Sequence, residues 1–134
     1  MTQMAQALAD GLTIAEAAEQ TGVSAHTLRY YERIGAFREP PERDSSGHRR
    51  YTERDLSWIT LLTRLRATGM PIATMLRYAE LAREGNGTAA DRKALLVAHR
   101  AEVAARIDEL QEDLELIDHK INVYEEIERT RFGR

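Results

Sequence analysis

Seven apolar side chains near the end of the chain constrain its fold more than any other sequence feature. They recur at alternating intervals of four and three residues: Val103, Ile107, Leu110, Leu114, Ile117, Ile121 and Tyr124. This is the a/d pattern of a coiled coil, and the remaining faces of the segment carry mostly charged residues. A lone helix would expose the apolar seam to water at a cost of roughly 25 cal/mol per Å2. We therefore expect the seam to pack on a partner helix or, as the alternative, on the chain's own preceding domain.

Two short helices joined by a tight glycine turn are predicted near the start of the chain. Thr13 and Glu16 have the spacing of a capping box, and Gly22 suits the end of the helix that they begin. Ser24 is a good N-cap for a second helix over about 25–34. Two helices connected in this way form a helix-turn-helix. An ordinary helical hairpin within a bundle is the alternative reading.

The segment 38–51 reads REPPERDSSGHRRY and predicts a small hairpin. Pro40 and Pro41 exclude a helix, and residues 44–47 form a turn cluster. Residues 48–51 then form a short basic strand. Because guanidinium groups bind phosphate in a bidentate manner, a wing that reaches toward phosphate explains the arginine pair better than a solvated loop does.

Two further helices are expected after this hairpin. The third runs from Thr52 to Gly69 and the fourth from Pro71 to about Glu84, with apolar faces toward a common core. Their core residues are predicted to be Leu56, Trp58, Ile59, Leu62 (or Leu61), Leu65, Ile72, Met75, Leu76 and Ala79.

The predicted organisation is mainly α: a winged helix-turn-helix head of four helices and a hairpin, followed by one long coiled-coil dimerisation helix. Residues 1–11 are expected to be a flexible tail and residues 12–84 the DNA-binding domain. Residues 85–87, Gly-Asn-Gly, are the candidate hinge. Residues 88–134 form the long helix and a short tail.

Charge is distributed unevenly along the chain. The formal net charge is −3, which taken alone argues weakly against a nucleic-acid partner. Residues 24–68, however, carry nine Arg against six acidic residues, a net of +3. Residues 88–134 carry eight basic against eleven acidic residues, a net of −3. A basic middle therefore lies between acidic ends, which suits a head that binds DNA and a long helix held away from it.

The chain contains no cysteine. This excludes disulfides, thiolate metal sites, cysteine-ligated iron–sulfur clusters and redox thiols. The four histidines are scattered, and His99 and His119 are too far apart to share a metal within one helix, so no metal site is predicted. No nucleophile–base pair and no phosphate-binding glycine loop is present in the sequence. We predict neither catalysis nor a cofactor.

No apolar stretch is long enough to cross a bilayer, and no signal peptide is recognisable at the N-terminus. A cytoplasmic protein without a membrane partner is expected.

The segment Thr13 to Leu76 closely resembles the N-terminal domain of the mercury-resistance regulator (MerR) family. Its most specific element is LRYYERIG at residues 28–35, followed by RYT-x-x-DL at 50–56 and RLR-x-x-GM at 64–70. The resemblance covers about half of the chain in the family's order and spacing. The long helix resembles the family's antiparallel dimerisation coiled coil.

The resemblance implies a homodimeric transcription regulator that binds a palindromic promoter with a long spacer. Such proteins kink and undertwist the spacer, commonly with an effector bound, so that RNA polymerase engages both promoter elements. The second helix enters the major groove, and base edges are read from its N-terminal half. In the paired tyrosines, Tyr30 is placed for phosphate contact and Tyr31 for packing. The residues expected to bind DNA are Thr13, Ser24, Ala25, His26, Thr27, Arg29, Tyr30, Arg33, His48, Arg49, Arg50, Tyr51 (as support for the wing) and Arg64.

The chain departs from the family pattern in its sensor, because the cysteines of many short members are absent. A further expectation places a small-molecule pocket between the head and the coiled coil, lined by Met70, Met75, Tyr78 and Leu81 together with residues of the partner's long helix. The alternative is that these four residues are plain core. Two other functions stay open. One is a repressor or architectural protein without an effector, and the other is a coiled-coil adaptor whose head binds protein.

Overall fold

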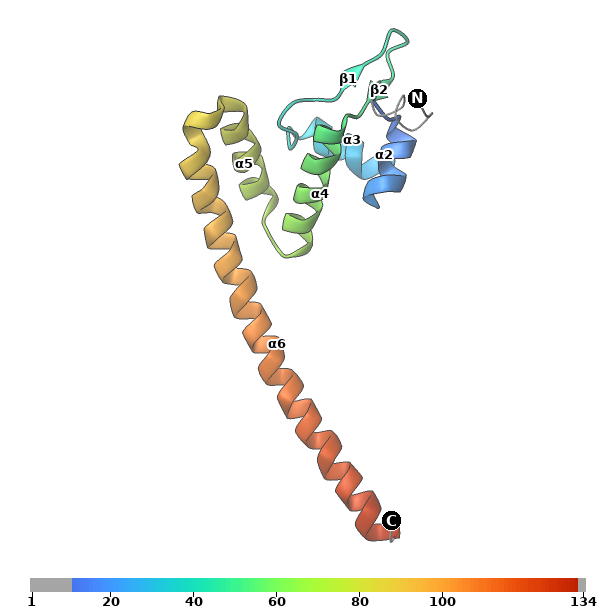
Figure 1. Ribbon diagram of the computed structural model, residues 1–134, viewed down its shortest axis with the longest axis vertical. Coiled ribbons are helices and arrows are strands. Elements are labelled where there is room, and N and C mark those ends of the chain that lie inside the picture. Colours follow the sequence, from blue (N-terminus) through green and yellow to red (C-terminus); the bar gives the residue numbers. More distant parts are fainter. Residues whose placement is uncertain (1–10, 133–134) are drawn as a thin grey trace. The chain divides into compact units, whose positions relative to one another are not determined.

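The computed structural model describes residues 11–132 and is mainly helical (Figure 1). The elements follow in the order α2 (Ile14–Thr21), α3 (Ala25–Arg33), β1 (Glu42–Arg43), β2 (Arg49–Arg50), α4 (Glu53–Ala67), α5 (Ile72–Glu84), η1 (Asn86–Thr88) and α6 (Ala89–Phe132). Four helices, a hairpin and a long helix were predicted, and this fold class is confirmed. No helix among residues 11–132 is long and apolar enough to cross a membrane.

Contacts divide the described residues into two compact units, one that ends at Leu95 and one that begins at Leu96. The boundary lies inside α6, and the hinge expected at 85–87 stays a prediction. Around residues 85–87 the chain turns into the short helix η1. There the Thr88 hydroxyl donates to the carbonyl of Gly85 over 2.8 Å, and Arg92 donates to the same carbonyl over 3.2 Å. We refer to the described part of the first unit as the head.

Local capping chemistry determines where the helices of the head begin. Both Thr13 and Thr52 form complete capping boxes, with Glu16 and Asp55 respectively. Each threonine hydroxyl accepts from a backbone N–H of the first turn, and the acidic side chain accepts from the backbone N–H of the threonine. These bonds satisfy N–H groups that have no partner within the helix.

The turn between α2 and α3 depends on Gly22. Its φ of 73° is left-handed, and its N–H donates to the carbonyl of Ala18 to close α2. Ser24 then caps α3 by accepting from the N–H of Thr27 at 3.1 Å. The predicted helix-turn-helix is present, with its second helix ending one residue earlier than expected.

The core of the head is formed by all four of its helices and by the residues flanking the hairpin. Its largest fully buried side chains are Leu12, Leu28, Tyr51, Ile59, Leu62, Met70 and Met75. Leu12 and Tyr51 also exchange backbone hydrogen bonds of 2.7 and 2.8 Å, which fix β2 beside the start of α2 (Figure 1).

The predicted tail 1–11 lies outside the described residues except for Gly11. Gly11 is buried, and it has a φ of 88°. A Cβ at this position would lie 3.0 Å from the Cβ of Arg50. Gly11 therefore belongs to the packed head and not to a loose tail, because the chain passes directly against β2 here.

Candidate nucleic-acid interface

Helix α3 presents one exposed polar face. His26, Arg29, Tyr30 and Arg33 are exposed and follow the i, i+3, i+4, i+7 spacing of a single helical face. Leu28 and Tyr31 point the other way and are buried. The sequence placed Tyr30 outward and Tyr31 inward, and their exposures of 36% and 7% agree.

The aromatic and basic groups of this face lie against one another. The guanidinium of Arg33 lies over the Tyr30 ring, 5.6 Å from its centroid. The Tyr30 ring is itself 6.0 Å from that of Tyr31. This packing orders the C-terminal end of the exposed face. His26 and Arg29, in its N-terminal half, have no hydrogen-bond or ion-pair partner within residues 11–132.

The start of α3 holds the smaller predicted residues. Ser24 is exposed, and its hydroxyl donates to that of Thr27 over 3.0 Å. Ala25 and Thr27 are half-buried. Thr13 occupies the equivalent cap position on α2. These four residues therefore frame the N-terminal ends of α2 and α3, where backbone N–H groups favour anions such as phosphate.

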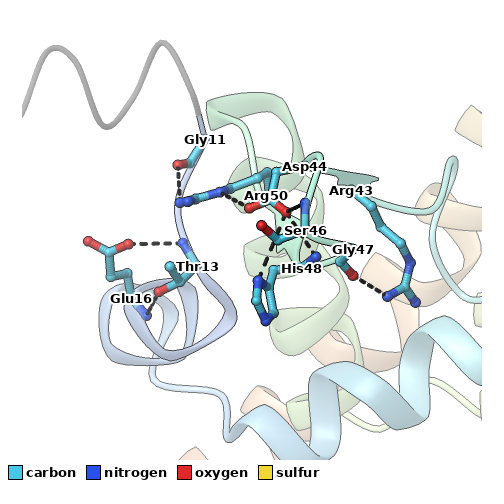
Figure 2. A network of polar contacts seen from close by, with 9 residues as sticks. All are labelled: Gly11, Thr13, Glu16, Arg43, Asp44, Ser46, Gly47, His48 and Arg50. Carbon is cyan, nitrogen blue, oxygen red and sulfur yellow. Dashed lines mark hydrogen bonds and ion pairs between the residues drawn. The ribbon is translucent and has the colours of Figure 1, made fainter.

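The hairpin predicted as a wing is present, with Glu42 opposite Arg50 and Arg43 opposite Arg49. Asp44 organises its turn (Figure 2). One oxygen of this carboxylate accepts from the backbone N–H groups of Ser46 and His48, at 2.9 and 3.0 Å. The other accepts from Nε of Arg50 at 3.2 Å.

These contacts lower the pKa of Asp44, chiefly through the backbone hydrogen bond from His48. The carboxylate is therefore ionised throughout the neutral range and holds the turn closed. The His48 side chain is 79% exposed and lies 3.9 Å from Asp44. It becomes a second cationic partner of the turn when it is protonated.

Both wing arginines have carboxylate partners inside the head, which the sequence did not predict. Nε of Arg49 donates to Oε1 of Glu32 on α3 over 2.6 Å, and its Nη2 lies 3.4 Å from Oε2. This bond raises the pKa of Arg49. Arg50 bridges Asp44 and the carbonyl of Gly11, the latter at 3.4 Å (Figure 2). The wing arginines thus join the hairpin to α3 and to the segment before α2.

Tyr51, which was expected to support the wing, does not reach the surface. Its side chain is 1% exposed, so it is part of the core and can act on the wing only as an internal support. Side chains alternate between the two faces of an extended strand, so Arg50 and Tyr51 had to point in opposite directions. That alternation was the sequence signal for the burial of Tyr51.

The turn between α4 and α5 follows Arg64, one of the residues that the sequence predicts to bind DNA. Gly69 adopts a φ of 101° there. Arg66 closes the turn by donating to the carbonyl of Met70 over 3.2 Å. Arg64 is exposed in the last turn of α4 and has no partner among the described side chains. A free guanidinium is therefore held beside a closed turn.

The predicted effector residues do not form one pocket. Met70, Met75 and Leu81 are packed in the core of the head, with exposures of 1%, 0% and 4%. A cavity of about 300 Å3 is present elsewhere in the head, and Tyr78 alone of the four lines it. Within the head, core packing accounts for Met70, Met75 and Leu81, which is the alternative that the sequence left open.

The seam residues of α6 are largely exposed. From Ile107 to Tyr124 the exposures range from 49% to 60%, and Val103 is intermediate. Val97, Leu116 and Ile127 are further exposed apolar residues of α6 that the heptad does not include. Within residues 11–132, no group of three His, Asp or Glu side chains could hold a metal ion.

Comparison with known proteins agrees with this geometry. The family model for MerR HTH family regulatory proteins matches residues 12–81, and a model described as MerR, DNA binding, matches residues 56–122. An uncharacterised HTH-type transcriptional regulator of Haemophilus influenzae is 38% identical over 113 residues, which are 84% of this chain and 83% of the relative. The HTH-type transcriptional regulator AdhR of Bacillus subtilis is 40% identical over 66% of this chain and 63% of its own length.

A solved structure is also similar. HiNmlR, a MerR family regulator lacking the sensor domain and crystallised bound to promoter DNA, is 38% identical with a TM-score of 0.77. The match covers 85% of this chain and 90% of that one. These relatives are transcriptional regulators and not enzymes. The chain belongs to the MerR family of transcriptional regulators.

Proposed function

We propose that the chain binds promoter DNA with α3 in the major groove. The observation that carries this is the division of α3 into a buried face and an exposed face that bears His26, Arg29, Tyr30 and Arg33. A B-DNA major groove admits one helix, and arginine to guanine is the commonest specific contact. Arg29 is the residue expected to read a base edge, since it has no partner to give up.

Phosphate contacts on either side of α3 would fix its register. Arg64 at the α4–α5 turn and His48 at the tip of the hairpin are exposed for this role. Arg49 and Arg50 contribute to DNA binding in a different way from Arg64 and His48, because each is already paired with a carboxylate. They position the wing, and their remaining N–H groups are available to phosphate oxygens. The similarity to HiNmlR, which is bound to promoter DNA, supports this arrangement.

The active form is proposed to be a homodimer joined through α6. The seam from Val103 to Tyr124 is regular over three heptads and is exposed from Ile107 onward, so a second copy would remove a continuous apolar surface from water. A two-fold dimer requires a palindromic site whose half-sites are whole turns of about 34 Å apart.

Regulation is proposed to act through the spacer between the half-sites. Membership of the MerR family supports a dimer that bends and untwists promoter DNA so that RNA polymerase engages it. Bending a site of this length costs of order 1–6 kcal/mol, which further protein contacts offset. An effector would be a small molecule that shifts the balance between the cost of bending the DNA and the contacts that offset it. A protein that represses without any effector is the alternative.

Footprinting of the purified protein on its own upstream intergenic DNA, at two salt concentrations, tests this function. The expected result is a protected palindrome across a promoter spacer, weakening steeply as salt rises because phosphate contacts release counterions. No protection at low salt would exclude self-regulation. Binding to a protein partner that Arg29→Ala leaves unchanged would favour the adaptor function.

A further inference from the structure

A cavity of about 300 Å3 lies entirely within the head. Its walls come from the segment leading into the hairpin, from Tyr51 after the hairpin, from α4 and from Tyr78 of α5. The four aromatic residues that line it are Phe37, Tyr51, Trp58 and Tyr78. A volume of this size is at the lower end for small-molecule sites and fits a ligand of one or two rings.

The aromatic wall is held in place by interactions outside the cavity. The rings of Trp58 and Tyr78 are stacked, with centroids 5.5 Å apart and an interplanar angle of 23°. Nε1 of Trp58 donates to the carbonyl of Ala36 over 3.0 Å. Arg83 donates to the carbonyl of Phe37 over 2.7 Å. The wall is therefore preorganised, which lowers the entropic cost of binding a flat ligand.

The polar groups around the cavity are mostly unpaired donors. Arg38 and Arg54 line it, and neither has a hydrogen bond or ion pair within the part of the chain that the structure describes. The buried hydroxyl of Tyr51 has no partner there either. Of the two lining carboxylates, that of Asp55 already accepts from the N–H of Thr52. The side chain of Glu39 is exposed, as is that of Arg54, whereas Arg38 is half-buried. Unpaired donors therefore outnumber the free acceptors.

We propose that this cavity is an effector site for a small aromatic carboxylic acid. The ring of the ligand packs against Trp58 and Tyr78, and its carboxylate pairs with Arg38 or Arg54. Aromatic walls favour a flat ring, and guanidinium groups bind carboxylates through paired N–H donors. The effect of this ligand on transcription rests on the proposed function, whereas its binding does not.

The cavity adjoins the elements that would contact DNA. Tyr51 directly follows β2 and exchanges backbone hydrogen bonds with Leu12, the residue next to the Thr13 cap of α2. The segment from Phe37 leads into β1. A ligand against Tyr51 and Phe37 thus touches both approaches to the wing. Occupancy is expected to change operator affinity by altering how firmly the wing is held.

The binding test uses the intrinsic fluorescence of Trp58, which is the only tryptophan of the chain. Benzoate is the probe. Cyclohexanecarboxylate keeps the charge without the aromatic ring, and benzylamine keeps the ring with the opposite charge. We expect a saturable fluorescence change with benzoate and at least about tenfold weaker binding of both controls, since a charge-assisted bond and a stacked ring each contribute on the order of a factor of ten.

Two variants locate the ligand. Ser57→Phe fills the cavity from an exposed lining position, and Thr60→Phe makes the same change at an exposed position of α4 that does not line it. The first is expected to abolish the benzoate response and the second to preserve it. The double variant Arg38→Gln and Arg54→Gln should weaken benzoate about tenfold or more while leaving thermal unfolding unchanged.

Three results would overturn the proposal: no saturable response to benzoate, equal affinity for benzylamine, or full binding by a folded Ser57→Phe variant. If the protein protects its promoter but does not bind benzoate, the proposed function stands and the proposed effector site is refuted. If the protein binds benzoate as predicted but protects no promoter, the site stands and the proposed function is refuted.

Discussion

Nε of Arg49 lies 2.6 Å from Oε1 of Glu32, and this bond joins the second strand of the hairpin to the last turn of α3. Both side chains are about three-quarters buried, with exposures of 24% and 21%. Arg43 lies 3.9 Å from the other oxygen of the same carboxylate. Glu32 therefore holds both strands of the wing against the helix proposed to read DNA.

Replacing Glu32 by Gln should reduce the discrimination between operator and random DNA. The change releases the wing from α3 and removes a negative charge near the proposed DNA surface. The affinity for the operator should fall, while the affinity for random DNA should rise slightly and depend more strongly on salt. The cost in head stability is expected to be about 0.5–1 kcal/mol, as for a partly exposed ion pair.

Titration of the protein with operator DNA and with random DNA, at several salt concentrations, measures the ratio of the two affinities. Glu84→Gln is the charge-matched control, because Glu84 is exposed at the end of α5 and has no partner within residues 11–132. An unchanged ratio in Glu32→Gln would show that the pair does not position the wing.

Arg29→Ala should weaken operator binding about 10- to 100-fold, corresponding to roughly 1–3 kcal/mol for a lost base contact. Stability should change little, because Arg29 is exposed and unpaired. Arg77→Ala is the matched control on α5, away from the proposed interface, where Arg77 forms only an exposed ion pair with Glu80. Equal losses for operator and random DNA would instead make Arg29 a phosphate contact.

The sequence predicted those parts of the molecule that local chemistry determines. Capping boxes at Thr13 and Thr52 and left-handed glycines such as Gly22 involve residues only a few positions apart. The apolar seam of α6 is equally local, because residues spaced alternately four and three apart lie on one face of any α-helix. These features are readable without knowing the tertiary fold.

The sequence could not predict how distant segments meet. Glu32 and Arg49 are 17 positions apart in the sequence, and nothing in either segment identifies the other as its partner. The cavity brings together Phe37, Trp58 and Tyr78 from three separate segments. Composition alone also does not distinguish a packed core from a lined cavity, so the sequence left both interpretations open for Met70 and Met75.

Asp44 should stabilise the wing at neutral pH and lose this effect in acid. Its pKa is lowered in the folded protein, chiefly by the hydrogen bond from the His48 N–H. A depressed carboxylate pKa contributes stability above the unfolded value, near pH 4, that is lost as pH falls through the folded value. Asp44→Asn should therefore unfold more easily than the unchanged protein at pH 7, and the difference should shrink toward pH 3.

Hydrogen exchange of the 44–50 amides and urea unfolding at both pH values measure this effect. Asp91→Asn, an exposed aspartate in the first turn of α6, is the control. A difference that is the same at pH 3 and pH 7 would mean that ionisation of Asp44 does not hold the turn.

Leu114→Glu should convert the proposed dimer to a monomer. Leu114 lies at the centre of the a/d seam and is 56% exposed, so dimerisation would bury it. In the Leu114→Glu variant, dimerisation would instead bury two carboxylates, which is costly. Leu116→Glu is the matched control, because Leu116 is an equally large exposed residue of α6 outside the seam. Sedimentation equilibrium should show a dimer for the unchanged protein and for Leu116→Glu, and a monomer for Leu114→Glu. Operator protection should be lost with the dimer, since one head reaches only one half-site. If Leu114→Glu remained dimeric, the interface would lie elsewhere; if the unchanged protein were monomeric, the seam would pack on the chain's own head.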